Sequence, residues 1–234
     1  MISFIVPAYN EEAELPETLR AIRTAAAGYE YEIVLVNDGS TDATAAIGEQ
    51  FGARVISIER RQIAAARNAG ARAGRGDIFI FVDADTQIGP EHVLGAINSL
   101  ENGFAGGGSR LAFDGEIPPW GKVMFHVFSL LYFGLNLGAG AFLFTTRENF
   151  FAAGGFDEIY FAGEEVFFTV ALKRLGRFKL LPEPAITSGR KLRMYSGWKV
   201  FGSLFSVLFG GPRGVMSRKK LDMWYAGERE KPMS

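Results

Sequence analysis

Two aspartates one residue apart, Asp83 and Asp85, are the residues whose spacing most directly suggests chemistry. They follow an uncharged run of β-branched and aromatic residues, Ile78–Val82, that predicts a buried strand. In open α/β sheets ligands bind at the carboxyl ends of the strands, so both carboxylates would reach the ligand-binding edge. Mg²⁺ is typically held by one or two carboxylates together with substrate phosphates. The pair therefore predicts a metal-bound phosphate ligand, although Asp-x-Asp by itself also fits an ordinary polar strand end.

Polar clusters also follow the first two predicted strands, at residues 2–6 and 32–36. The first cluster contains Tyr9, whose ring offers a flat face to a nucleobase, and the second contains Asp38, a hydrogen-bond acceptor for a base N–H. Arg67, in a predicted helix, offers a cation or a donor to a base edge. Taken singly, these residues also fit a strand-end aromatic, a turn residue and a solvated helix charge. Together, at the ends of parallel strands, they favour one nucleotide site.

Strands and helices that alternate along the first half of the chain would position these residues. Strands are predicted at 2–6, 32–36, 54–58 and 78–82, and helices at 12–27, from a cap at Ser40 or Thr41 to about 50, 63–73 and 90–100. The second half predicts strands at 104–113, 141–145 and 177–181, helices at 118–137, 165–175 and 195–209, and a loop at 154–157. This order predicts an α/β fold in one domain, a mostly parallel sheet with helices on both faces.

The composition narrows the classes of protein that the chain can belong to. It has 234 residues, 48% hydrophobic and 22% charged, which is typical of a globular domain. A net charge of −1 argues against nucleic acid as a partner. The absence of cysteine excludes disulfides, thiolate metal sites and cysteine nucleophiles. The N-terminus predicts a strand instead of a signal peptide, so a cytoplasmic protein is expected.

Two apolar segments raise the question of membrane contact. Residues 123–146 carry no charge and are long enough to span a bilayer, but Asn136 and the glycines near 138–140 favour a buried core helix. Residues 198–216 are apolar and have basic neighbours on both sides. They fit either a peripheral contact with a membrane or a helix packed on the domain.

Five short motifs occur in order along the chain: VPAYNEE at 6–12, VNDGSTD at 36–42, ARNAG at 66–70, DAD at 83–85 and GGFDE at 154–158. Gly163, Glu164 and Glu165 follow them. In these motifs the chain resembles the family-two nucleotide-sugar glycosyltransferases of the GT-A fold, over roughly residues 2–182. The resemblance implies a nucleotide-sugar-binding half (1–113), an acceptor and catalytic half (114–182) and an apolar, basic C-terminal extension (183–234).

The resemblance also implies roles for the matched residues. The nucleotide pocket would be formed by Pro7, Ala8, Tyr9, Glu11, Asp38, Arg67, Asp83 and Ala84. Within it, Asp38 would bind the base, Arg67 would contact the base or its surroundings, and Asp83 would lie near the ribose. Asp85 would hold a divalent metal, Mg²⁺ or Mn²⁺, which bridges the diphosphate and stabilises the leaving group.

Chemistry in an inverting member of the family needs one base to take the proton of the acceptor hydroxyl. The family usually has Glu-Asp where this chain has Glu164 and Glu165, so Glu165 is expected to be the base and Glu164 is the second choice. Acidic residues at a helix N-terminus are also stabilising without any catalytic role. On the acceptor side the resemblance implies Gly155, Phe156 and Asp157. Arg190 or Lys191, which follow the last predicted strand, are expected near the diphosphate, where negative charge develops.

These expectations define a metal-dependent, inverting glycosyltransferase. It would move a sugar from a nucleotide-diphosphate donor to an acceptor hydroxyl or a lipid phosphate, in the cytoplasm or at the inner face of the membrane. A nucleotidyltransferase would need a glycine-rich loop after the first strand and a dehydrogenase would need Gly-x-Gly-x-x-Gly; the chain has neither. The alternative is a catalytically impaired nucleotide-sugar-binding or scaffold protein, suggested by glutamate at 165.

Overall fold

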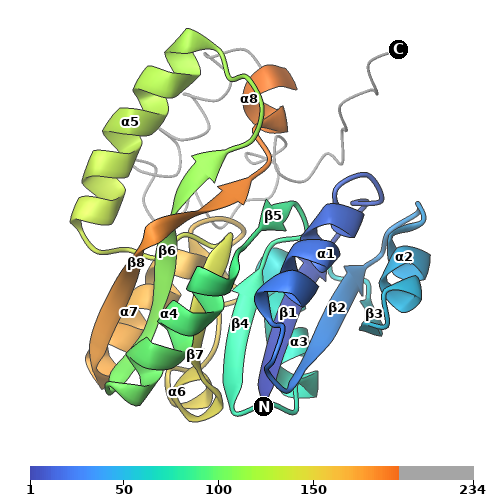
Figure 1. Cartoon of the computed structure of the whole chain (residues 1–234), viewed down its shortest axis with the longest axis horizontal. Helices are drawn as coiled ribbons and strands as arrows, with labels where there is room; N and C mark the ends of the chain where they lie inside the picture. The colour runs from blue at the N-terminus through green and yellow to red at the C-terminus, as the bar shows by residue number, and fades with distance from the viewer. Residues whose placement is uncertain (195–234) are drawn as a thin grey trace.

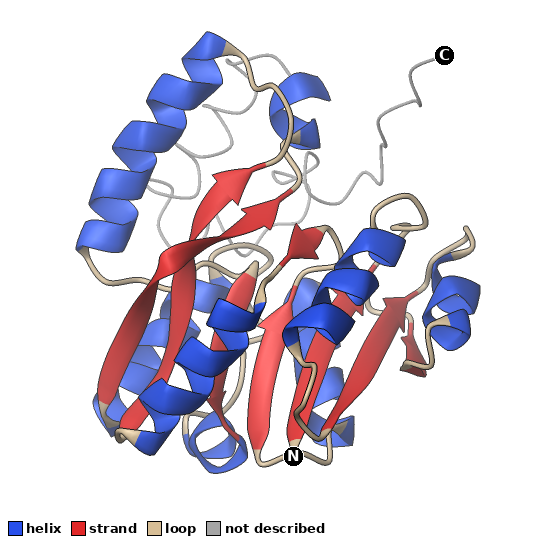
Figure 2. Ribbon diagram, viewed as in Figure 1, coloured by secondary structure: helices blue, strands red, loops and turns tan. Residues whose placement is uncertain are grey.

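The computed structural model describes residues 1–194, which form a curled eight-stranded sheet between two layers of helices (Figure 1, Figure 2). The strands are β1 Ile2–Ala8, β2 Tyr31–Asp38, β3 Arg54–Ile58, β4 Ile78–Val82, β5 Thr86–Gln87, β6 Phe104–Phe113, β7 Phe142–Thr146 and β8 Arg177–Thr187. Their order across the sheet is β3-β2-β1-β4-β7-β6-β8-β5, and of these only β7 and β5 run against the others. The predicted α/β fold with a mostly parallel sheet is confirmed.

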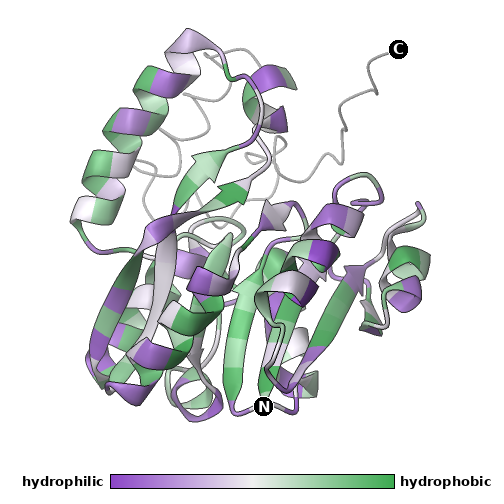
Figure 3. Cartoon of the chain, in the orientation of Figure 1, coloured by the Kyte–Doolittle hydropathy of each residue, from purple (hydrophilic) through white to green (hydrophobic). Residues whose placement is uncertain are grey.

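Helices cover both faces because the central strands are apolar on both sides. The helices are α1 Leu15–Ala25, α2 Thr44–Gln50, α3 Ile63–Ala73, α4 Pro90–Glu101, α5 Pro119–Gly134, α6 Arg147–Ala152, α7 Glu164–Leu175 and α8 Arg190–Met194. Phe4 and Val6 of β1 bury against α1 and α4, whereas Ile5 between them points to the face covered by α3, α6 and α7. The central strands are therefore hydrophobic along their length, as Figure 3 shows for β1 and β4.

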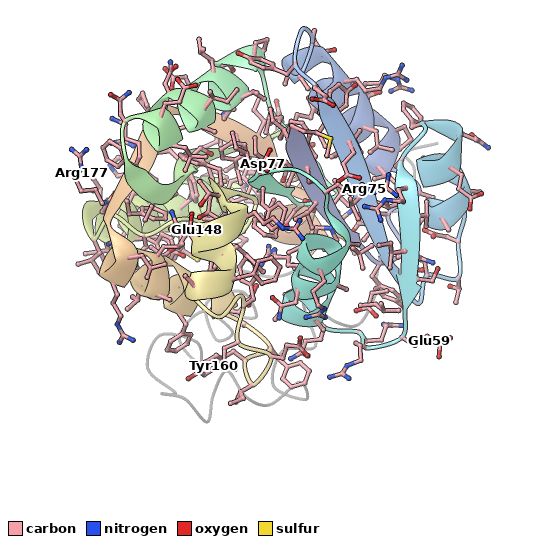
Figure 4. The ribbon with its side chains drawn as sticks, turned by 90° about the horizontal axis from the view of Figure 1, so that it is seen from below. Glu59, Arg75, Asp77, Glu148, Tyr160 and Arg177 are labelled. Carbon is pink, nitrogen blue, oxygen red and sulfur yellow. The ribbon has the colours of Figure 1, made fainter. Side chains whose placement is uncertain are left out.

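The register of the sheet brings the motif residues to one edge. Strands β1, β2 and β4 are parallel neighbours, so their carboxyl ends lie side by side. Because β7 is antiparallel and begins with Phe142 opposite Val82, the loop before β7 returns to the same edge. Figure 4 looks onto the opposite edge, where Arg75 and Asp77 precede β4 and Glu148 follows β7.

Most predicted boundaries agree with the structure, and the differences have local causes. Strand β1 continues through Pro7 to Ala8, although proline was expected to end it. Its pairing with β4 ends at Ile5, so the missing N–H of Pro7 interrupts no bond to that neighbour. Strand β2 continues through Asp38, a residue expected in a turn.

Several short elements were not predicted from the sequence. Helix α2 begins at Thr44 and its N-cap residue is Ala43, so the predicted cap by Ser40 or Thr41 is wrong. Strand β5, helix α6 and helix α8 were missed, and β8 is longer than expected. Strand β5 has two residues and pairs with the end of β8, a long-range contact that local sequence patterns do not encode.

The prediction of a buried core helix over residues 123–146 is wrong. Helix α5 ends at Gly134, and the remainder of the segment forms a loop and strand β7. Tyr132 and Phe133 are buried, but Val123, Val127, Leu130 and Leu131 are between 52% and 67% exposed. In the described residues no helix is long and apolar enough to cross a membrane. The segments predicted at 195–209 and 198–216 lie outside the described residues, and the proposed division of the chain stays a prediction.

Candidate active site

Hydrogen bonds join the loop after β1 to the loop after β2. The backbone N–H of Asn10 donates to Ser40 Oγ at 3.0 Å, and that of Thr41 donates to Asn10 Oδ1 at 2.8 Å. The backbone N–H of Glu11 donates to Thr44 Oγ1 at 2.8 Å. Asn10 adopts a left-handed conformation (φ 52°), in which asparagine is tolerated better than most residues. The two loops therefore form one wall of the edge at which Pro7, Ala8 and Tyr9 leave β1.

Asp38 holds the segment that leads into α3. Asp38 is 4% exposed, and its carboxylate accepts hydrogen bonds from the backbone N–H groups of Arg60, Arg61 and Gln62, each at 2.7 Å. Both oxygens are used in this way. Asp38 thus anchors the loop between β3 and α3, and its expected bond to the base stays a prediction.

That loop places Arg61 over Tyr9. The guanidinium carbon of Arg61 lies 3.3 Å from the centroid of the Tyr9 ring, a cation–π contact. Arg61 reaches this position with a left-handed backbone (φ 50°), which is unfavourable for a residue with a long side chain. The contact covers one face of the Tyr9 ring, so a nucleobase could stack on that face only if Arg61 moved. The expected stacking of a base on Tyr9 stays a prediction.

Arg67 is the centre of a buried ion-pair network. Its side chain is 1% exposed, and its Nη1 donates to Glu164 Oε1 at 2.6 Å. Its Nη2 donates to Asp83 Oδ1 at 2.8 Å and to the carbonyl oxygen of Gly140 at 3.0 Å. Burial alone would lower the pKa of Arg67, but the surrounding carboxylates raise it, so the cation is retained. Arg67 thereby ties the end of β4, the loop before β7 and the start of α7 together.

Gly140 is required for this close approach. A Cβ atom at that position would lie 2.6 Å from Nη2 of Arg67, too close for a non-bonded contact. No local sequence pattern identifies this glycine, because its importance depends on a side chain 73 residues away. The geometry makes Arg67 a positioning residue between two carboxylates, and its expected contact with the base stays a prediction.

The two glutamates at the start of α7 have different environments. Glu164 is 3% exposed and paired with Arg67, whereas Glu165 is half-buried, and no hydrogen bond of its carboxylate to a described side chain is found. Burial and the neighbouring Glu164 raise the pKa of Glu165 to about 8, and Arg67 opposes this rise. A carboxylate with a pKa near working pH is well suited to general base catalysis. The pairing of Glu164 makes Glu165 the better candidate for the base.

Asp83 and Asp85 lie in the turn after β4, where the backbone N–H of Thr86 donates to the Asp83 carbonyl oxygen at 3.0 Å, and their carboxylates have different surroundings. Asp83 pairs with Arg67, and burial raises its pKa against the effect of that cation. Ala84 between them is buried, and its carbonyl oxygen accepts a hydrogen bond from Thr18 Oγ1 at 2.9 Å. Asp85 lies instead beside the end of β8, where Thr187 Oγ1 is 3.4 Å from its Oδ1.

Arg190, the first residue of α8, lies between the carboxylates of Glu11 and Asp85. It makes a bidentate pair with Glu11, Nη1 to Oε2 and Nη2 to Oε1 at 2.6 Å each. Its Nη2 is also 3.1 Å from Asp85 Oδ2. Arg190 was expected near a diphosphate, and it does lie beside the predicted metal ligand. Its position between two carboxylates shows that the site favours a cation.

The oxygen donors near Asp85 fit a magnesium or manganese ion whose coordination shell is completed by oxygens of a bound ligand. Carboxylate oxygens of Asp85 and Glu11 are hard donors. No group of three or more acidic, histidine or cysteine side chains suited to a metal occurs in residues 1–194. Mg²⁺ is usually bound through one or two carboxylates plus substrate phosphates, so two carboxylates are compatible with a metal that binds together with a diphosphate.

The predicted acceptor loop is built around Asn68. Its Oδ1 accepts from the backbone N–H of Phe156 at 2.9 Å, and its Nδ2 donates to the Phe156 carbonyl oxygen at 2.8 Å. Phe156 is 2% exposed and packs in the core with Phe81 and Phe168. Asp157 Oδ1 accepts from the N–H of Ile159 at 3.0 Å and stabilises the turn.

Gly155 allows this arrangement through a left-handed backbone (φ 70°), and a Cβ there would lie 2.8 Å from Asn68 Oδ1. In the ARNAG motif only Arg67 has a role predicted from the sequence. In the structure the next residue, Asn68, holds the predicted acceptor loop through two hydrogen bonds to the Phe156 backbone. Figure 4 labels Tyr160 on the same loop, where its ring stacks on Phe167 with 3.9 Å between centroids. The acceptor role of Gly155, Phe156 and Asp157 stays a prediction.

Comparison with known protein families gives one match over most of the chain. The family model described as glycosyl transferase family 2 matches residues 3–160. An undecaprenyl-phosphate 4-deoxy-4-formamido-L-arabinose transferase of Pseudomonas fluorescens is 40% identical over 115 residues, which are 44% of this chain and 33% of the relative. A dolichol-phosphate mannosyltransferase of Pyrococcus furiosus is 33% identical over 125 residues, 51% of this chain and 36% of the relative. The chain therefore matches about a third of the length of these relatives.

Solved structures share the fold at low sequence identity. The mannosyltransferase PcManGT of Pyrobaculum calidifontis, in complex with GDP-Man and Mn²⁺, has a TM-score of 0.69 at 19% identity, covering 88% of this chain and 60% of that one. Glucosyl-3-phosphoglycerate synthase of Mycobacterium tuberculosis, with Mn²⁺, UDP and glucosyl-3-phosphoglycerate, has a TM-score of 0.61 at 21% identity, covering 93% and 81%. These similarities support the GT-A fold.

Proposed function

The chain belongs to glycosyl transferase family 2, and we propose that it transfers a sugar from a nucleotide diphosphate to an acceptor with inversion, in a metal-dependent reaction. The observation that carries the proposal is the Arg67 network. It connects Asp83, at the predicted donor edge, to Glu164, which precedes the candidate base Glu165. Donor-side and base-side groups are thus held by one buried cation.

On the donor side, the loops after β1 and β2 would receive the nucleoside, and Tyr9 would stack on the base. Asp85 would hold Mg²⁺ or Mn²⁺, which neutralises charge on the diphosphate when that group leaves. Two solved structures of the same fold contain Mn²⁺ with a nucleotide or nucleotide sugar, which supports this assignment. Cationic donors next to a leaving diphosphate stabilise the charge that develops there, and Arg190 is the candidate of this chain.

On the acceptor side, Glu165 would remove the proton of an acceptor hydroxyl as that oxygen bonds to the anomeric carbon. The bond to the diphosphate breaks on the opposite face, which inverts the configuration. A base with a pKa of about 8 is partly deprotonated at neutral pH and can accept this proton. The Glu164 carboxylate is less suited to this role, because its Oε1 accepts a hydrogen bond from Arg67 Nη1 at 2.6 Å.

The relatives' names favour a lipid-phosphate acceptor, since they include undecaprenyl-phosphate and dolichol-phosphate transferases. Exposed aliphatic side chains along α5 support the same class, because large apolar side chains in contact with water commonly mark interaction surfaces. A phosphate monoester is already ionised near neutral pH, as its second pKa is about 6. A lipid phosphate therefore needs no base, whereas a hydroxyl acceptor needs one.

This difference makes one experiment decisive for the acceptor class. Release of UDP or GDP from its sugar donors would be measured with undecaprenyl phosphate and with simple sugar acceptors, for the wild type, Glu165→Gln and Asp85→Asn. With a hydroxyl acceptor, Glu165→Gln should lose about 10²- to 10⁴-fold in rate; with a lipid phosphate it should lose much less. Asp85→Asn should lose activity with either acceptor. No turnover by the wild type with any donor would support the binding or scaffold alternative instead.

Contact with a membrane can be tested on the same preparation. We expect the protein to co-float with vesicles that contain anionic lipid, and the double variant Leu130→Ser, Leu131→Ser to float less, because it removes apolar area from the exposed face of α5. Leu94→Ser, which changes an exposed leucine on α4, is the matched control. Equal flotation of the three proteins would argue against α5 as the contact.

A further inference from the structure

Arg190 occupies the position next to Asp85 that a metal ion would need. Its side chain is only 5% exposed, although it belongs to a short helix at the end of the described chain. It bonds to both oxygens of Glu11 and to Oδ2 of Asp85, so one guanidinium neutralises two carboxylates. Glu14, the third acidic group near it, has a pKa raised first by burial, and Arg190 opposes that rise.

The backbone fixes Arg190 in this place. The N–H of Ser188 donates to the carbonyl oxygen of Asp85 at 3.1 Å, and β8 pairs with β5, Thr187 opposite Thr86. The N–H of Gly189 donates to Asp114 Oδ1 at 2.7 Å. The segment that carries Arg190 is therefore attached directly to the segment that carries Asp85.

Electrostatic repulsion disfavours a metal ion on Asp85 while Arg190 keeps this position. A divalent cation on Asp85 would lie within a few ångströms of a guanidinium, and like charges at such a distance repel strongly in a site screened from water. A diphosphate removes the conflict, because it supplies both oxygen ligands for the metal and a new partner for the guanidinium.

We propose that in the free protein the Arg190 guanidinium takes the place of the metal ion beside Asp85. It moves away only when a nucleoside diphosphate binds together with the metal. This inference rests on the proposed function and adds the order of binding. Metal alone would bind weakly, and metal and diphosphate would strengthen each other's binding. By thermodynamic linkage that strengthening is the same in both directions.

The test is binding of Mn²⁺, measured as loss of the free-ion signal in electron paramagnetic resonance, without nucleotide and with UDP or GDP. For Arg190→Gln we expect Mn²⁺ alone to bind about tenfold tighter than to the wild type, because the guanidinium no longer pairs with Asp85 or repels the ion. The factor by which diphosphate raises the affinity for Mn²⁺ should fall about as much in this variant. Arg190→Lys, which keeps the charge, should remain close to the wild type.

Arg54→Gln is the control, because Arg54 is paired with Glu32 at the opposite edge of the sheet and should leave Mn²⁺ binding unchanged. Thermal melting would confirm that each variant is folded. If Mn²⁺ and diphosphate bind the wild type but Arg190→Gln changes neither the affinity for Mn²⁺ alone nor the coupling, the inference is wrong and the proposed donor site stands. If no protein in the set binds Mn²⁺ with either diphosphate, the donor site is wrong and the inference falls with it.

Discussion

Replacing Arg67 by methionine should destabilise the protein strongly and in a pH-dependent way. The change keeps an unbranched side chain but removes the cation that faces Asp83, Glu164 and the Gly140 carbonyl. Arg67 is 1% exposed and Glu164 has a side-chain exposure of 4%, so water cannot replace the lost partner there. Removing one member of a buried ion pair typically lowers the free energy of unfolding by about 3–5 kcal/mol.

The pH dependence of this loss has a definite sign. The pKa of Asp83 is already raised by burial, and without Arg67 it would rise further. A carboxyl whose pKa is higher in the folded than in the unfolded state destabilises the protein as pH rises through that range. The difference between the wild type and Arg67→Met should therefore grow between pH 5 and pH 8.

Urea unfolding at pH 5 and pH 8, followed by circular dichroism, would measure both effects. At pH 8 the loss corresponds to a fall in Tm of about 6–20 °C for a chain of this size. Arg67→Lys keeps a charge but cannot form the same set of bonds, so it should lose about 1.5–3 kcal/mol. Arg54→Met, which removes a partly exposed arginine from Glu32, is the matched control and should lose about 1 kcal/mol or less. A loss below about 1 kcal/mol for Arg67→Met at pH 8, or a loss that does not change with pH, would refute the reasoning.

Four further predictions concern the site. With a hydroxyl acceptor, kcat/KM should rise with pH and level off above about 8, because Glu165 must be deprotonated, and Glu165→Gln should lack this limb of the pH–rate profile. Gly140→Ala places a Cβ 2.6 Å from Arg67 Nη2 and should lower Tm, whereas Gly134→Ala, where a Cβ meets no atom within 4 Å, should not. Asn68→Ala removes both bonds to the Phe156 backbone and should reduce the free energy of unfolding by about 1–3 kcal/mol, measured by urea titration. A chelator such as EDTA should abolish turnover and added Mn²⁺ should restore it; full activity in EDTA would contradict a metal on Asp85.

The hydrophobic pattern alone determined the layered α/β fold. Alternating strand and helix signals through residue 101 specified parallel strands, and parallel strands place their carboxyl ends at one edge. That reasoning was sufficient to bring Tyr9, Asp38 and Asp83 to the same edge. It needed only local periodicity and the rule that strands alternating with helices form a largely parallel sheet.

The partners of the charged side chains were decided only by the tertiary structure. Arg67 bonds to Glu164 and Gly140 across 97 and 73 residues, and Arg190 bonds to Glu11 across 179. Burial makes such pairings specific, because an unpaired charge in the interior is strongly unfavourable. No local pattern could show that Glu164 is paired while Glu165 is left with a raised pKa, or that Arg190 takes the place beside Asp85. The sequence thus determined which chemical groups meet at the edge of the sheet, and long-range packing decided which of them neutralise one another.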